Sequence, residues 1–205
     1  MLTWIQNTNN SLIGATNALN VVQTRLWDGA NWQTAGTIGP DPGMLLWSTV
    51  AYDGTNGVFL AAIDPDDDQS TTGDQELWSA TFDGASWSAL ARLTTNTVQD
   101  IKPQAVYDSA GRLLVVWYQN TNLVMRIGDL NLGSPTVVGQ LSGASSQKDF
   151  HLVTGPGGQI STVWEDLAAD GSGPDPMLVN YDATLGVWSQ PLRLMSNTNQ
   201  LEATT

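Results

Sequence analysis

The segment from residue 64 to residue 76 holds the densest group of side chains that could do chemistry. Its acids are candidate ligands for a hard cation, and those we single out are Asp64, Asp66, Asp68, Asp74 and Glu76. Alternating carboxylates supply the several oxygen atoms that Ca²⁺ takes. An EF-hand loop would need glycine and glutamate where Gln69 and Gln75 stand, so the match is partial. We therefore expect either a calcium site or a solvated acidic loop that keeps the protein soluble.

Tryptophan side chains are the second candidate, because aromatic faces stack on the apolar faces of sugars. Six of the nine recur at equivalent points of a sequence repeat and are expected to pack between repeats: Trp4, Trp32, Trp87, Trp117, Trp164 and Trp188. Trp27, Trp47 and Trp78 do not recur and are the better candidates for ligand contact. Asp166 and Asp170, from a second acidic segment, complete this candidate ligand-binding set.

The composition excludes several kinds of chemistry and partner. Among 205 residues there is no Cys and one His, which excludes disulfides, thiolate sites and multi-histidine metal centres. Lys and Arg total 7 against 20 Asp and Glu, and a net charge of −13 argues against nucleic acid and anionic membranes as partners. No apolar run approaches the roughly 18 residues of a membrane-spanning helix, so we expect no membrane insertion.

Two short sequence segments are repeated along the chain, and these repeats define its organisation. The string at 4–9 comes back at 117–122. The string at 26–32, which contains an Asp-Gly turn, comes back at 81–87 and in degraded form at 180–188. The aspartates of this turn are predicted to be Asp28, Asp83, Asp129 and Asp182.

Each repeat contains four short apolar runs separated by turn residues, and no stretch has the 3.6-residue periodicity of a helix. Asp-Gly between β-branched and aromatic residues is typical of a hairpin, because glycine accepts the positive φ of a tight turn. Four antiparallel strands per repeat, in four repeats, predict an all-β, β-propeller-like fold of four blades. We expect one domain, 1–205, with repeats at about 1–44, 45–102, 103–148 and 149–200.

The order of strands within a blade follows from their hydrophobicity. The continuous apolar runs at 57–63, 113–117 and 160–164 are expected to be second strands, buried on both faces between neighbouring blades. An innermost strand precedes each of them. By this spacing, 201–205 is a strand stub that would close the first blade. If it does not pair there, the open edge favours a homodimer or membership of a larger propeller.

Residues 83–117 carry a resemblance to a known group of repeats. The run at 103–117, together with the Asp-Gly turn and the segment at 87–94, resembles repeats of bacterial exported and surface β-propeller proteins, which are loosely related to the sialidase-like, Asp-box propellers. The resemblance covers nearly all of the chain and implies a propeller fold. An Asp-box separates its Asp and Gly by one residue, whereas Asp83 and Gly84 are adjacent. The sequence pattern Trp-Asp-Gly-x-x-Trp at 27–32 also resembles that of small sugar-binding propeller lectins.

Strong repeats without convergent catalytic residues favour a non-catalytic binding or scaffolding module of a bacterial protein that is secreted or at the cell surface. Its protein or glycan ligand is expected on the rim formed by the loops between second and third strands and by the loops that enter the innermost strands. A carbohydrate-binding, lectin-like propeller is the first alternative. A sialidase-like glycoside hydrolase is the second, although Arg92 and Arg193 fall in expected outer strands and would not converge on the axis.

Overall fold

The computed structural model describes residues 1–7, 20–39, 43–66, 71–128, 130, 135–140, 149–167 and 174–194. In these residues the chain forms four antiparallel sheets, which we call blades 1 to 4 in chain order. Blade 1 consists of β1(Leu2–Asn7), β2(Asn20–Trp27) and β3(Trp32–Ile38). Blade 2 consists of β4(Met44–Tyr52), β5(Gly57–Asp64), the 3-10 helix η1(Thr72–Asp74), β6(Glu76–Phe82) and β7(Ala91–Arg92).

The other two blades follow the same plan. Blade 3 consists of β8(Asp100–Tyr107), β9(Leu113–Gln119), β10(Asn122–Gly128) and β11(Thr136–Gln140). Blade 4 consists of β12(Phe150–Thr154), the 3-10 helix η2(Pro156–Gly158), β13(Ile160–Leu167), β14(Pro174–Asp182), β15(Val187–Trp188) and β16(Leu192–Arg193). Its outer strand is interrupted, so β15 and β16 both pair with β14. Blade 1 has three described strands, and 201–205, the predicted closing stub, lies outside the described residues.

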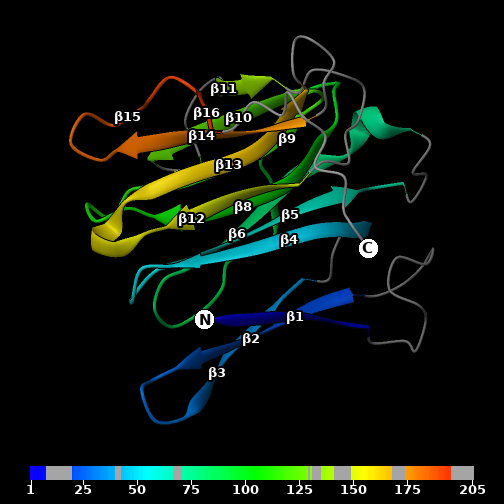
Figure 1. Ribbon diagram of the computed structural model, residues 1–205. Coiled ribbons are helices and arrows are strands. Elements are labelled where there is room, and N and C mark those ends of the chain that lie inside the picture. The colour runs from blue at the N-terminus through cyan, green and yellow to red at the C-terminus, as the bar shows by residue number, and fades with distance from the viewer. Residues whose placement is uncertain are drawn as a thin grey trace, which may run out of the picture.

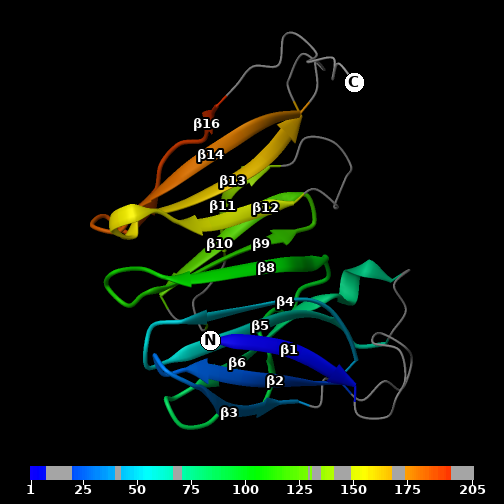
Figure 2. The same cartoon turned by 60° about the horizontal axis from the view of Figure 1, so that its bottom comes forward.

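Successive strands are neighbours in every blade, and the order runs outward from β4, β8 and β12. Figure 1 shows blade 1 below the other three sheets, and Figure 2 shows the four sheets in chain order, with blade 1 at one end and blade 4 at the other. The innermost strands of blades 2, 3 and 4 are neighbours in space, β4 beside β8 and β8 beside β12. This arrangement confirms the predicted all-β, β-propeller-like fold class.

The second strands form the core, as their apolar sequences predict. All of β5 is buried, and β9 is buried from Leu113 to Tyr118. A large cluster of buried apolar side chains joins blades 2, 3 and 4, and a smaller cluster joins blades 1 and 2. Leu60 belongs to the large cluster and its neighbour Phe59 to the small one, so the two faces of β5 pack against different blades. Each blade therefore depends on its neighbours to bury its surface.

Aspartates fix the tight turns between strands. Asp28 follows β2, Asp83 follows β6 and Asp182 ends β14, and the Oδ1 atom of each accepts hydrogen bonds from the backbone N–H groups two and three residues ahead. Asp53 makes the same two bonds in the turn between β4 and β5. These bonds satisfy amides that the sheets leave unpaired. Asp129, the remaining predicted turn aspartate, lies outside the described residues.

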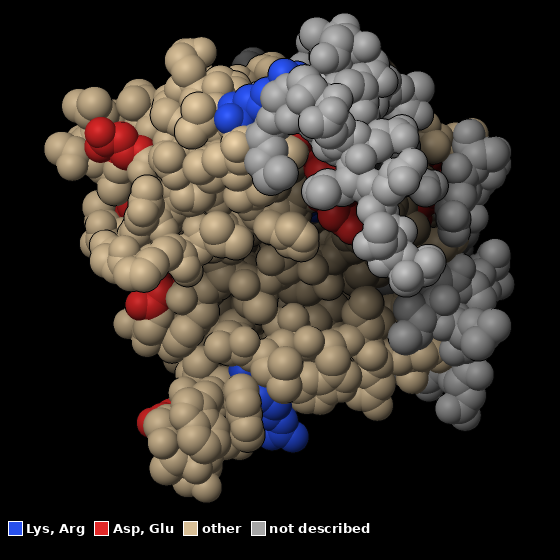
Figure 3. Space-filling view, in the orientation of Figure 1, with Lys and Arg blue, Asp and Glu red and all other residues tan. Residues whose placement is uncertain are grey.

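Charge is sparse over much of the surface. Figure 3 shows a mostly uncharged face with separate acidic and basic side chains in its described part. Within the described ranges, no helix is both long enough and apolar enough to cross a membrane. Polar contacts to any ligand on this face must therefore come from a few charged side chains and from uncharged polar ones.

Candidate functional site

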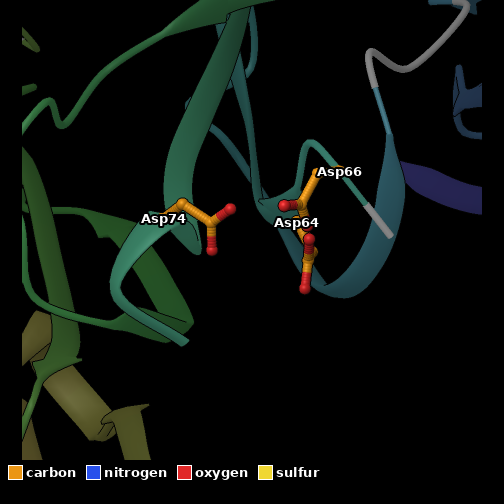
Figure 4. A group of neighbouring side chains, drawn as sticks. All are labelled: Asp64, Asp66 and Asp74. Atoms are coloured by element: carbon orange, nitrogen blue, oxygen red, sulfur yellow. The ribbon is translucent and has the colours of Figure 1, made fainter. Parts of the chain in front are cut away.

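Three of the five predicted cation ligands come together in the loop between β5 and β6. Asp64 ends β5, Asp66 lies in the turn that follows, and Asp74 belongs to η1. One carboxylate oxygen of each lies within 4.8 Å of those of the other two. Figure 4 shows Asp74 facing Asp64 and Asp66 across a common space. Asp68 lies outside the described residues.

Asp64 is the buried member of this group, which we call the acidic triad. Its exposed fraction is 0%, its Oδ2 accepts a hydrogen bond from Gln75 Nε2 at 3.2 Å, and its Oδ1 has no hydrogen-bond partner among the described residues. Asp74 Oδ1 is also buried without a partner. Burial raises the pKa of the Asp64 carboxyl; the hydrogen bond from Gln75 lowers it, and the nearby Asp66 and Asp74 raise it. The triad therefore brings three acidic groups together, and two of its buried oxygens have no partner among the described residues.

Glu76, the fifth predicted ligand, is engaged elsewhere. It is fully buried at the start of β6, and its Oε1 lies 2.7 Å from Arg92 Nη2 of β7. Blade 4 repeats this ion pair between Asp175 of β14 and Arg193 of β16. Both arginines thus attach an outer strand to the third strand of its own blade. Such pairs account for Arg92 and Arg193 without any role at the propeller axis.

A second candidate site, which we call the axial groove, lies over the middle of the innermost strands β4 and β8 and the start of β12. It has a volume of about 350 Å³, and β4, β8 and the start of β12 line it with residues that include Trp47, Thr49, Lys102, Gln104, Asp149 and Phe150. Met44 at the start of β4 pairs with Asp64 at the end of β5. The axial groove and the acidic triad therefore lie toward the same rim of the molecule.

Irregular backbone in β4 and β8 places the side chains of the axial groove. The register of β4 shifts between Leu45 and Trp47, and that of β8 shifts between Ile101 and Gln104. Lys102, inside the second bulge, has φ of 53°. This conformation costs a residue other than glycine about 1–3 kcal/mol. Bulges redirect side chains near functional sites, and both of these do so at the groove.

Lys102 connects the three blades that form the groove. Its Nζ lies 2.8 Å from Asp149 Oδ1 of blade 4 and 6.0 Å from the centroid of the Trp47 ring of blade 2. The hydrogen bond from Lys102, followed by its charge, holds the pKa of the Asp149 carboxyl below its ordinary value. Gln104 ties β8 to β12, because its Nε2 donates to the backbone oxygen of Phe150 at 2.5 Å. The walls of the groove are thus held by polar bonds between blades.

The predicted ligand-binding residues do not all converge. Trp47 lies in the axial groove and is 38% exposed. Trp78 packs against the apolar cluster between blades 1 and 2. Asp166 lies within β13, at a position whose side chain falls outside the described ones, and Asp170 is outside the described residues. Trp47 is thus the member of this set that the structure brings to a groove.

Trp27 lies on the opposite rim, at the end of β2, where its ring centroid is 5.4 Å from that of Trp32. The pairs Phe82 with Trp87 and Tyr181 with Trp188 repeat this contact in blades 2 and 4. A tryptophan does not recur at the position of Trp27, in agreement with the sequence interpretation. Its position does recur, but the aromatic residue there changes from blade to blade. Blade 1 ends the stack, which leaves Trp27 and Trp32 about half exposed.

Comparisons with known proteins support the fold. No protein-family model and no curated protein sequence matches the chain. Among solved structures, it is similar to an endo-arabinase from Bacteroides thetaiotaomicron, with 12% identity and a TM-score of 0.51 over 95% of this chain and 77% of the other. It is also similar to an exo-β-1,3-galactanase from Phanerochaete chrysosporium, with 14% identity and a TM-score of 0.46 over 85% of this chain and 43% of the other. The chain thus spans less than half the length of that galactanase. The likeness to the endo-arabinase supports the β-propeller-like all-β fold.

Proposed function

We propose that the protein is a carbohydrate-binding β-propeller module, secreted or at the cell surface, that takes a neutral glycan in its axial groove. The observation that carries this proposal is the partly exposed Trp47 ring beside the Lys102–Asp149 pair. Aromatic faces pack on sugar rings, and a few placed polar groups fix the ligand's orientation. The strained backbone at Lys102 adds support, because such strain gathers at binding sites.

The charge of the groove favours an uncharged ligand. Lys102 and Asp149 neutralise each other there. The whole protein carries a net charge of −13, which repels polyuronates and sulfated polysaccharides at long range. A neutral sugar chain meets no such repulsion, and its hydroxyl groups can both donate and accept hydrogen bonds.

Binding fits the described groove better than hydrolysis does. Most glycoside hydrolases use two carboxyl groups about 5 to 9.5 Å apart, and the acid among them has a raised pKa. Asp149 is the single carboxylate among the described residues that line the groove. Its pKa is lowered, so it stays ionised and accepts hydrogen bonds instead of donating a proton. We therefore place the protein among binding modules and not among hydrolases.

The test is binding of the full chain to neutral polysaccharides, with arabinan as the first probe because the similar B. thetaiotaomicron protein is an endo-arabinase. The panel continues with galactan, xylan and β-glucan, and polygalacturonate serves as the acidic probe. We expect at least one neutral probe to bind by calorimetry and polygalacturonate not to bind. Trp47→Ala should weaken that binding about tenfold or more, because it removes the stacking face.

Trp27→Ala is the matched control, since it removes an exposed tryptophan from the opposite rim. It should leave glycan affinity unchanged. Absence of binding to every neutral probe would contradict the proposal. So would a loss of affinity in Trp27→Ala that Trp47→Ala does not show. Release of reducing sugar from a bound probe would instead identify a hydrolase.

A further inference from the structure

The acidic triad contains two buried oxygen atoms that no described group satisfies. Asp64 is fully buried, and both its Oδ1 and Oδ1 of Asp74 lack a hydrogen-bond donor. An unsatisfied buried polar atom costs about 1–3 kcal/mol, and more when it is charged. Buried charges in proteins are accordingly paired or bound to metal ions. These two oxygens therefore indicate a positive partner that the side chains around them do not supply.

Arg92, which binds the neighbouring Glu76, is already engaged. Arg92 donates to Glu76 Oε1 at 2.7 Å and to the backbone oxygen of Thr94 at 3.0 Å. Turning Arg92 toward Asp64 would leave Glu76, which is itself fully buried, without its charge partner. A mobile cation meets the need of the triad without that loss.

The triad is held in shape by groups behind it. Gln75, which donates to Asp64, accepts a hydrogen bond from Gln99 Nε2 at 2.6 Å, so the orientation of its amide is fixed. The backbone N–H of Gln75 donates to Thr72 and closes η1, which carries Asp74. The backbone of Asp64 packs against Gly43, where an added Cβ would lie 2.2 Å from the Asp64 carbonyl oxygen. Ligands fixed in advance lose little entropy on binding.

We propose that Asp64, Asp66 and Asp74 bind one Ca²⁺ ion. Oxygen atoms within 4.8 Å of one another can surround an ion whose Ca–O distances are 2.3–2.6 Å. Carboxylates are hard ligands of the kind that Ca²⁺ prefers, whereas Zn²⁺ prefers nitrogen and sulfur. Asp66 is exposed, which leaves a side open for water ligands and for entry of the ion. The flexible coordination of Ca²⁺ suits this half-open geometry better than the strict octahedron of Mg²⁺ does.

The bound ion would tie the end of β5 to η1, and the end of β5 pairs with the start of β4. That strand carries Trp47 three residues after Met44, the residue that pairs with Asp64. The cation site thus goes beyond glycan binding and does not depend on it. Its loss would loosen one wall of the rim but would not remove the Trp47 ring itself.

The experiment is calorimetric titration of the chelator-treated full chain with CaCl₂, together with melting temperatures in CaCl₂ and in EDTA. We expect one ion per chain, and a rise of about 5 to 10 °C in Tm at a hundredfold excess over Kd. Asp74→Asn should abolish the heat and the rise. Asp64→Asn should abolish both as well, and should also raise Tm in EDTA, because it removes a buried charge of nearly the same shape.

Glu165→Gln is the matched control, because Glu165 is an exposed acid at the corresponding end of blade 4. It should keep the full calcium response. No heat and no shift of Tm in the wild-type chain would overturn the proposal. A response that survives in Asp74→Asn and is lost in Glu165→Gln would overturn it too, because the ion would then bind in another loop. A larger response to MgCl₂ would contradict the choice of Ca²⁺.

Discussion

Asp108, in the turn between β8 and β9, makes more interactions than the other turn aspartates. Its Oδ1 accepts hydrogen bonds from the backbone N–H groups of Ala110 and Arg112, and its Oδ2 accepts one from Arg112 Nε at 2.7 Å. Tyr181 of blade 4 donates to the same Oδ2 at 3.5 Å. Burial raises the pKa of this carboxyl, but the bonds from Arg112 and Ala110 outweigh it and the pKa is lowered. One carboxylate thus serves both a turn and a contact between blades.

Replacing this carboxylate should change stability and its dependence on pH. Because the folded pKa lies below the unfolded one, the stabilisation is complete above about pH 4 and is lost as pH falls through the folded pKa. Asp108→Asn should lower the free energy of unfolding by about 2–3 kcal/mol at pH 7. It should also flatten the decline in stability below about pH 4, as measured by urea denaturation at several pH values.

The raised pKa values of Asp64 and Glu76 affect the pH dependence of stability in the opposite direction. They do so equally in the wild-type chain and in Asp108→Asn, so the difference between the two proteins reports on Asp108. Asp28→Asn, at an exposed turn whose aspartate also accepts two backbone bonds but has no arginine partner among the described residues, should cost less than Asp108→Asn. Equal losses in the two variants would refute the importance given to Arg112 and Tyr181.

At the scale of the strand, the two bulges decide what the axial groove contains. A regular β8 would not give Lys102 its positive φ, and a regular β4 would reverse the face to which Trp47 points. The strands could be predicted from sequence because apolar runs and Asp-Gly turns are local signals. The bulges depend on how two strands align, which no single run of residues specifies. Pro103 inside an innermost strand was the available signal, since proline in a sheet is confined to edges and bulges.

Substitutions at Lys102 separate backbone strain from side-chain function. Lys102→Ala keeps the strain and removes the contacts to Asp149 and Trp47. Lys102→Gly removes both, because glycine adopts positive φ at little cost. The glycine variant should therefore be more stable than the alanine variant by about 1–2 kcal/mol in urea denaturation, and both should bind glycan more weakly. An alanine variant as stable as the glycine variant would show that Lys102 is not strained.

The acidic triad shows a different limit of prediction from sequence. The acidic segment can be located from the sequence, because its high density of carboxylates is visible there. Which of its acids come together cannot be predicted in the same way. It depends on η1, which places Asp74 near Asp64, and on the ion pair between Arg92 and Glu76. Likewise, Asp149 carries no motif, and it reaches the groove only because blades 3 and 4 stand side by side.

The contacts between neighbouring blades differ in extent. The large apolar cluster spans blades 2 to 4, whereas a smaller one attaches blade 1 to blade 2. A hydrogen bond from Trp87 Nε1 to Thr24 Oγ1 at 3.0 Å adds to the second junction. Leu2 and Trp4 of β1 are exposed by 49% and 40%. Blade 1 should accordingly be the least stable part of the described chain.

Hydrogen exchange read by mass spectrometry should reveal this gradient. We expect amides of β2 and β3 to exchange faster than those of β5 and β9, because local opening costs less where less apolar surface is buried. Thr24→Val removes the acceptor for Trp87 at nearly constant volume and should speed exchange in blade 1 while leaving β9 unchanged. Equal protection in all four blades would contradict an unequal junction.

The axial groove takes one chemical group from each of three sheets: an indole from blade 2, an ammonium from blade 3 and a carboxylate from the start of blade 4. Each sheet has its own hydrogen-bond ladder, so a substitution in one wall leaves the register of the others intact. Ligand preference can therefore be altered one wall at a time. A library randomised at positions 47, 102 and 149 would vary the recognised sugar on a constant scaffold, which makes the fold a suitable starting point for engineered glycan reagents.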